Sequence, residues 1–174
     1  MALGIYASTT EPVGLDFSRS LLFPIALLAA LPFGPLAEEI GWRGFAQPRL
    51  LKRFGPFTCG MVLGAIWFIW HLPLFFAPAG TSLSGSPITL SGLLHYFGLL
   101  TGVSVLIVGF TRWTGAGLLS GVLLHLGMNA EIYRLFFDLS PDQLNRIEHW
   151  SVAPIWLLVG ILLWIGRSHG DGTP

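Results

Sequence analysis

The sequence predicts an all-α fold, a polytopic bundle of about five transmembrane helices. Hydrophobic residues make up 53% of the 174 residues and charged residues only 10%, whereas a soluble domain carries about 25% charged residues. The mean hydropathy is +0.70, and several apolar stretches approach the ~20 residues that cross a bilayer as a helix. The single cysteine, Cys59, excludes an intrachain disulfide, and the zero formal net charge gives no reason to expect nucleic acid as a partner.

Five stretches are the predicted spans: residues 21–50 (interrupted by Pro32 and Pro35), 59–77, 88–110, 115–137 and 152–166. Residues 1–19 contain Glu11 and Asp16 and no basic cluster before an apolar core, so no cleavable signal is predicted. We expect residues 1–19 to form an N-terminal extramembrane segment and residues 20–137 a membrane core. Residues 138–174 are expected to form an outer loop, the last transmembrane helix and a cytoplasmic tail.

Basic residues set the expected orientation, because cytoplasmic loops retain Lys and Arg. The ends of the first, third and fifth spans share one face if there are five spans, and they carry Arg49, Lys52, Arg53, Arg112 and Arg167. We therefore expect the N-terminus outside and the C-terminus in the cytoplasm, in a multi-pass protein of the cell membrane.

The first span contains three charged residues, Glu38, Glu39 and Arg43. Each charge near the centre of a membrane helix costs about 2.5–3.5 kcal/mol on insertion scales. Glu39 and Arg43 are four residues apart and can form a pair along one helical face, whereas Glu38 points about 100° away and needs another partner. The alternative is that the helix ends here and the charges lie in the interface, but apolar residues continue to Leu51.

Two later spans contain polar groups in otherwise apolar helices: His71 in the second, and His125 and Asn129, which share a face, in the fourth. Counted from the cytoplasmic span ends at ~1.5 Å per residue, Glu38 lies ~16 Å deep and both histidines ~18 Å deep. A lone membrane histidine is often only hydrogen-bonded to a neighbouring helix, but these residues fall in one layer. His95, at ~25 Å, is interpreted as a structural or rim residue, and His149 and His169 as residues of a loop and the tail.

This layer has the residue types for hydrolysis by activated water. A carboxylate beside an imidazole takes a proton from water, and a second imidazole with a carboxamide donates hydrogen bonds to an oxyanion. Cys59, Ser104 and Ser120 do not lie in a nucleophile motif. Two His and one Glu also make a zinc ligand set, although the His-Glu-x-x-His motif is absent. No cofactor is favoured, and zinc is the alternative.

Three motifs in this order resemble those of the CPBP (Abi) family, which includes the type II CAAX prenyl proteases. Glu-Glu-x-x-x-Arg, Phe-x-x-x-His and His-x-x-x-Asn are similar to Glu38-Glu39-x-x-x-Arg43, Trp67-x-x-x-His71 and His125-x-x-x-Asn129. The resemblance covers residues 22–137, so residues 20–137 are expected to be the catalytic core.

The resemblance implies an intramembrane endopeptidase in which Glu38 and His71 activate water, and His125 and Asn129 stabilise the oxyanion. Glu39 and Arg43 would support the site. The implied partners are the lipid bilayer and a membrane-associated peptide or protein substrate, such as a CAAX-type prenylated protein or a leader peptide.

The chain departs from the family pattern in two ways. Trp67 replaces the usual Phe, and the family core is generally preceded by further membrane helices, so we expect a truncated form. Two alternatives stay open: a catalytically silent member acting as a membrane chaperone or immunity factor, and a proton-coupled transporter, which also places Glu and His at mid-membrane. The paired repeats usual in transporters are not evident in the sequence.

Overall fold

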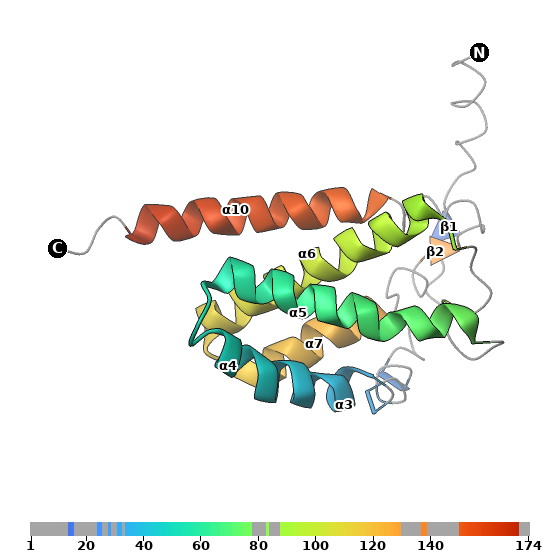
Figure 1. Cartoon of the computed structure of the whole chain (residues 1–174), viewed down its shortest axis with the longest axis horizontal. Helices are drawn as coiled ribbons and strands as arrows, with labels where there is room; N and C mark the ends of the chain where they lie inside the picture. The colour runs from blue at the N-terminus through green and yellow to red at the C-terminus, as the bar shows by residue number, and fades with distance from the viewer. Residues whose placement is uncertain are drawn as a thin grey trace, which may run out of the picture.

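The computed structural model describes residues 14–15, 24–25, 28, 31–32, 34–77, 83, 88–129, 137–138 and 150–170. Within these residues the protein is a bundle of helices with one short pair of strands (Figure 1). The predicted all-α class is therefore confirmed.

The charged part of the first predicted span forms one continuous helical stretch. It consists of α3 (Pro35–Glu39), the π-helical segment η2 (Ile40–Ala46) and α4 (Gln47–Leu50). The predicted interruption of the first span near Pro32 and Pro35 is confirmed, since residues 24–25 and 28 are helical and residues 31, 32 and 34 form turns. Pro35 occupies the first turn of the helix that follows, where the missing N–H of proline has no helical partner to lose. Gly34 precedes it with φ 139°, a conformation open in practice only to glycine.

The π-helical segment ends beside a second proline, Pro48. Proline cannot donate a bond to the preceding turn, and its ring collides with the carbonyl four residues earlier in a regular α-helix. A wider turn ahead of Pro48 relieves that collision, and such wide turns are frequent at functional sites.

The second and third predicted spans are confirmed as apolar helices. The chain forms α5 (Pro56–His71), continued by the 3₁₀ turn η3 (Leu72–Phe76), and then α6 (Leu90–Thr114). Residues 56–76 and 90–114 are long and apolar enough to cross a membrane. The Thr89 hydroxyl caps the start of α6 by accepting from the Gly92 N–H at 3.1 Å, and Gly115, at φ 67°, ends it.

Two shorter apolar helices follow, α7 (Gly117–Asn129) and α10 (Val152–Gly170). The predicted fourth span, residues 115–137, was too long, because Phe137–Asp138 forms strand β2, which pairs antiparallel with β1 (Gly14–Leu15). A membrane helix continued to Phe137 would have to carry the charged residues Glu131 and Arg134, and charges within a membrane span are costly.

Helix α6 occupies the centre of the bundle and packs against α5, α7 and α10 (Figure 1). The α3–α4 stretch and α10 run in the same direction as α6. Arg43 and Gln47 contact Ser104 and Thr111 in that order along α6, and Trp156 and Leu162 of α10 contact Gly98 and Gly109. The ends of the first, third and fifth predicted spans therefore lie at one end of the bundle.

The distribution of polarity is that of a membrane protein. Large apolar side chains face outward, including Leu119 on α7 (60% exposed) and Leu157 on α10 (65%), while Glu39 and Arg43 are buried. A soluble protein rarely exposes so continuous an apolar surface. The described chain is thus a helical membrane bundle with two long and two shorter apolar helices.

Helices α5 and α6 approach each other closely at the glycines of α5. A Cβ at Gly64 would lie 2.5 Å from Thr101 Cα, whereas a Cβ at Gly127 on α7 would meet nothing within 4 Å. We predict that Gly64→Ala lowers the free energy of unfolding by about 1–3 kcal/mol, because the helices must separate. Gly127→Ala is the matched control and should leave stability unchanged or slightly raised. Thermal unfolding in detergent measures both, and equal midpoints would contradict the close α5–α6 contact.

Candidate active site

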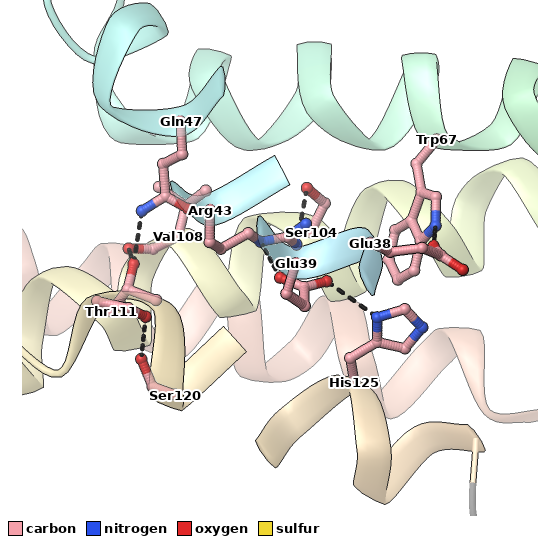
Figure 2. A network of polar contacts seen from close by, with 11 residues as sticks. Glu38, Glu39, Arg43, Gln47, Trp67, Ser104, Val108, Thr111, Ser120 and His125 are labelled. Atoms are coloured by element: carbon pink, nitrogen blue, oxygen red, sulfur yellow. Dashed lines mark hydrogen bonds and ion pairs between the residues drawn. The ribbon is translucent and has the colours of Figure 1, made fainter. Parts of the chain in front are cut away.

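The Glu39 carboxylate lies at the centre of a buried cluster. It is 0% exposed; its Oε1 accepts a hydrogen bond from His125 Nδ1 at 2.9 Å, and its Oε2 lies 3.1 Å from Arg43 Nε. These side chains come from α3, α7 and η2 and converge between the helices (Figure 2). The predicted Glu39–Arg43 pair is confirmed, and the bond to His125 links it to a helix 86 residues further along the chain.

Gly121 creates the space for this pair. It lies one turn before His125 on α7, and a Cβ there would stand 2.7 Å from Glu39 Oε2 and 2.9 Å from Arg43 Cγ. Any side chain would therefore push the ion pair away from α7. Gly121 was not predicted as a site residue, although a glycine four residues before a candidate histidine shares its helical face.

Arg43 is also enclosed, with 4% of its surface exposed. Its Nη2 donates to Ser104 Oγ on α6 at 3.5 Å, and its guanidinium carbon lies 5.5 Å from the centre of the Trp67 ring. One helical turn further, Gln47 Nε2 donates to Thr111 Oγ1 at 2.7 Å. The buried polar side chains thus form a column between η2–α4 and α6 (Figure 2).

Glu38 finds the separate partner that its position on the helix required. Its Oε2 accepts a hydrogen bond from the Trp67 indole Nε1–H at 2.8 Å. Trp67 is 1% exposed and belongs to the core cluster with Leu100, Val103 and Ile107. The sequence pattern predicted a packing role for Trp67 and did not indicate its N–H as this donor.

The two candidate histidines both contact the Trp67 ring edge-on. The ring centroids are 5.8 Å apart for Trp67 and His71, and 4.8 Å apart for Trp67 and His125. His71 Nδ1 lies 2.9 Å from the Trp67 carbonyl oxygen. A carbonyl or carboxylate oxygen only accepts, so Nδ1–H donates in both histidines and Nε2 is the nitrogen left for chemistry.

Asn129 ends α7 beside Glu38. A Cβ built on Gly34 would lie 3.3 Å from Glu38 Oε1 and 3.4 Å from Asn129 Nδ2, so both groups border the same glycine. The structure thus brings all six candidate residues together around Trp67 and Gly34: Glu38, Glu39, Arg43, His71, His125 and Asn129. His95 lies on α6, outside these contacts, while the structure does not describe His149 or the side chain of His169.

An open apolar pocket of about 690 Å³ leads to Glu38. This volume is within the usual range for small-molecule sites, about 300–1,000 Å³. The wall contains three aromatic side chains, and the full lining is Gly34, Ala37, Glu38, Gly41, Trp42, Phe45, Ala46 and Trp70. An apolar group held in this pocket would lie beside the Glu38 carboxylate.

The residues expected as zinc ligands have separate partners in this structure. Within the part of the chain that the structure describes, no three His, Cys, Asp or Glu side chains are grouped to hold a metal ion. The contacts divide the expected ligands, because Glu38 bonds to Trp67 and His125 bonds to Glu39.

Comparison with known proteins places this cluster in a family context. The model of the family described as type II CAAX prenyl endopeptidase Rce1-like matches residues 20–130, which include all six candidate residues. A curated relative, CAAX prenyl protease 2 of Methanococcus maripaludis, is 36% identical over 63 residues. That match covers 36% of this chain and 22% of the relative's length.

The Glu39–Arg43 pair predicts a non-additive stability series. Glu39→Gln or Arg43→Gln alone should lower the free energy of unfolding by about 3–5 kcal/mol, because each leaves an unpaired buried charge. The double variant should cost less than the sum of the two. Lys52→Gln removes an exposed charge and should change stability by less than about 0.5 kcal/mol. Unfolding of the four variants in detergent tests this, and strictly additive losses would show that the two charges are not coupled.

Proposed function

The chain belongs to the family of Rce1-like type II CAAX prenyl endopeptidases, and on that premise we propose that it hydrolyses a peptide bond of a membrane-associated protein with water activated by Glu38. The observation that carries this proposal is the position of Glu38. Its carboxylate is held by Trp67, borders Asn129 across Gly34, and forms part of the wall of the apolar pocket.

In the proposed reaction, Glu38 takes a proton from water while the water oxygen forms a bond to the carbonyl carbon of the substrate. His71 orients this water by accepting its second hydrogen at Nε2. The carbonyl electron pair moves to oxygen, giving a tetrahedral oxyanion; when it returns, the C–N bond breaks and the amine leaves with the proton from Glu38. General acid–base transfer of this kind contributes about 10²–10⁴-fold in rate.

The oxyanion would be stabilised by His125 and Asn129. Because Nδ1–H of His125 donates to Glu39, Nε2 can donate only when the ring is an imidazolium. The buried Glu39 carboxylate fixes the orientation of the His125 ring, and the Asn129 Nδ2–H adds a second donor. Preformed donors at the developing charge are usually the largest single contribution to acyl transfer. Glu39 and Arg43 therefore act through His125 in this mechanism.

The pocket suggests the class of substrate. Its aromatic wall, formed by Trp42, Phe45 and Trp70, suits a hydrocarbon chain such as a prenyl group attached close to the scissile bond. The family description supports a CAAX-type prenylated protein over a leader peptide. The outward-facing apolar surface supports a multi-pass location in the cell membrane, with substrate reaching the site from the bilayer.

Cleavage of a quenched fluorescent farnesyl-peptide by the detergent-purified full chain tests the proposed function. We expect Glu38→Gln to lower kcat at least about 100-fold and His125→Ala to lower it about 10²–10³-fold. Lys52→Gln, at the exposed end of the bundle, should retain wild-type activity. A chelator should have no effect, because Glu38 already accounts for water activation.

Three outcomes would overturn parts of this proposal. Loss of cleavage on chelation, restored by zinc, would replace water activation by Glu38 with a metal mechanism. Cleavage of a leader-peptide panel but not of the farnesyl-peptide would change the substrate class. A folded wild-type protein that cleaves neither would be a non-proteolytic member of the family.

The pocket leads to a separate prediction about the length of the prenyl chain on the substrate. A Cβ at Gly41, in the pocket wall, meets nothing within 4 Å, so Gly41→Leu should fill the pocket without disturbing the backbone. We expect KM for a farnesylated peptide to rise about tenfold, while KM for the same peptide carrying a five-carbon prenyl group changes little. Gly44→Leu, in the same π-helical segment but outside the lining, is the matched control. Equal effects on both peptides would show that the prenyl chain binds elsewhere.

A further inference from the structure

We propose that Trp67 is a positioning residue for catalysis: its indole N–H fixes one oxygen of Glu38 so that the other faces the reacting water. This inference rests on the proposed function, since it assigns Glu38 the role of base. The sequence pattern predicts only a packing role for an aromatic residue one turn before His71, and the positioning role is additional to that.

The hydrogen bond is short, and its donor is enclosed. Trp67 Nε1 lies 2.8 Å from Glu38 Oε2, and the indole is 1% exposed. A donor that is desolvated in this way bonds more strongly to a charged oxygen than one in water. Glu38 itself is only partly buried and lines the open pocket, so without this bond its carboxylate could adopt other rotamers in the pocket.

The indole is also held rigidly. It packs in the core cluster with Leu100, Val103 and Ile107, contacts His125 edge-on with centroids 4.8 Å apart, and lies beneath the Arg43 guanidinium at 5.5 Å. The core of α5 and α6 thereby fixes the direction of the N–H. A residue that is itself locked by packing can hold a catalytic group within the narrow range that reaction requires.

The two carboxylate oxygens of Glu38 are consequently distinct. Oε2 is occupied by Trp67, whereas Oε1 lies on the side of Gly34 and Asn129 (within 3.3 Å of a Cβ built on Gly34). The proposed oxyanion donor Asn129 is on that side too. Oε1 is therefore the oxygen placed to take the proton from a water that attacks a carbonyl held by Asn129.

The test replaces only the N–H. Amber suppression at position 67 introduces 3-benzothienylalanine, an isostere of tryptophan in which sulfur replaces the N–H and the shape is kept. We expect kcat for the farnesyl-peptide to fall about 3- to 10-fold, the loss of about one hydrogen bond, with KM within about twofold of wild type. Trp67→Phe, which also removes the N–H, should lower kcat by at least as much.

Trp156 is the matched control. Its Nε1 donates to the Gly98 carbonyl oxygen at 2.9 Å, so the same replacement removes a similar bond between α10 and α6 without involving Glu38. We expect the Trp156 analogue to lower the unfolding midpoint but to keep wild-type kcat.

Each outcome is decisive for one claim. If Trp67 acts only by packing, the 3-benzothienylalanine protein keeps wild-type kcat and only Trp67→Phe is impaired, which overturns the inference. If both Trp67 replacements lower kcat and the Trp156 analogue does not, positioning is supported. If wild type cleaves normally and Glu38→Gln does too, the proposed base is wrong, and this result is separate from any effect at Trp67.

Discussion

A single buried carboxylate constrains the whole arrangement. Glu39 is fully enclosed in an apolar bundle, and an unpaired charge there would cost several kcal/mol, about 3–5 kcal/mol in typical cases. Arg43 and His125 both contact it. The features that surround the pair follow from this requirement: the bare glycine at 121, the Ser104 hydroxyl beside Arg43, and the aromatic face of Trp67 beneath the guanidinium.

The helices themselves are held by close packing of small residues. Gly60 and Gly64 of α5 lie against the backbone of α6, and Gly102 of α6 receives Ile155 and Trp156 of α10. In a bilayer, lipid is as apolar as leucine, so association depends on such close approach and on buried polar contacts. Helix α6 provides both, with glycine and valine toward α5 and α10, and Ser104 and Thr111 toward the α3–α4 stretch.

The sequence was most informative where charged residues lie in an apolar span, because such residues have few ways to find a partner. It predicted the Glu39–Arg43 pair and a layer containing Glu38, His71 and His125, because spacing along a helix sets both face and depth. It did not predict that Trp67 would bond to Glu38, since that contact joins two helices whose rotation is fixed by tertiary packing. The predicted fourth span was too long, since Phe137 belongs to strand β2; hydropathy was given more weight than Glu131 and Arg134. Gly34 was missed because a positive φ leaves no pattern in composition.

The distance along the chain between Glu39 and His125 bears on how the protein enters the membrane. Ribosomes add about 5–20 residues per second, so the 86 residues that separate the two take ~4–17 s to synthesise. During that interval α3 and η2 must reside at the translocon or in lipid without α7. Arg43, made within a second of Glu39, is the counter-ion at hand, and its position one turn away lets the two charges insert as a neutral unit. Arg43 can thus pair with Glu39 during membrane insertion, before His125 is synthesised and completes the cluster.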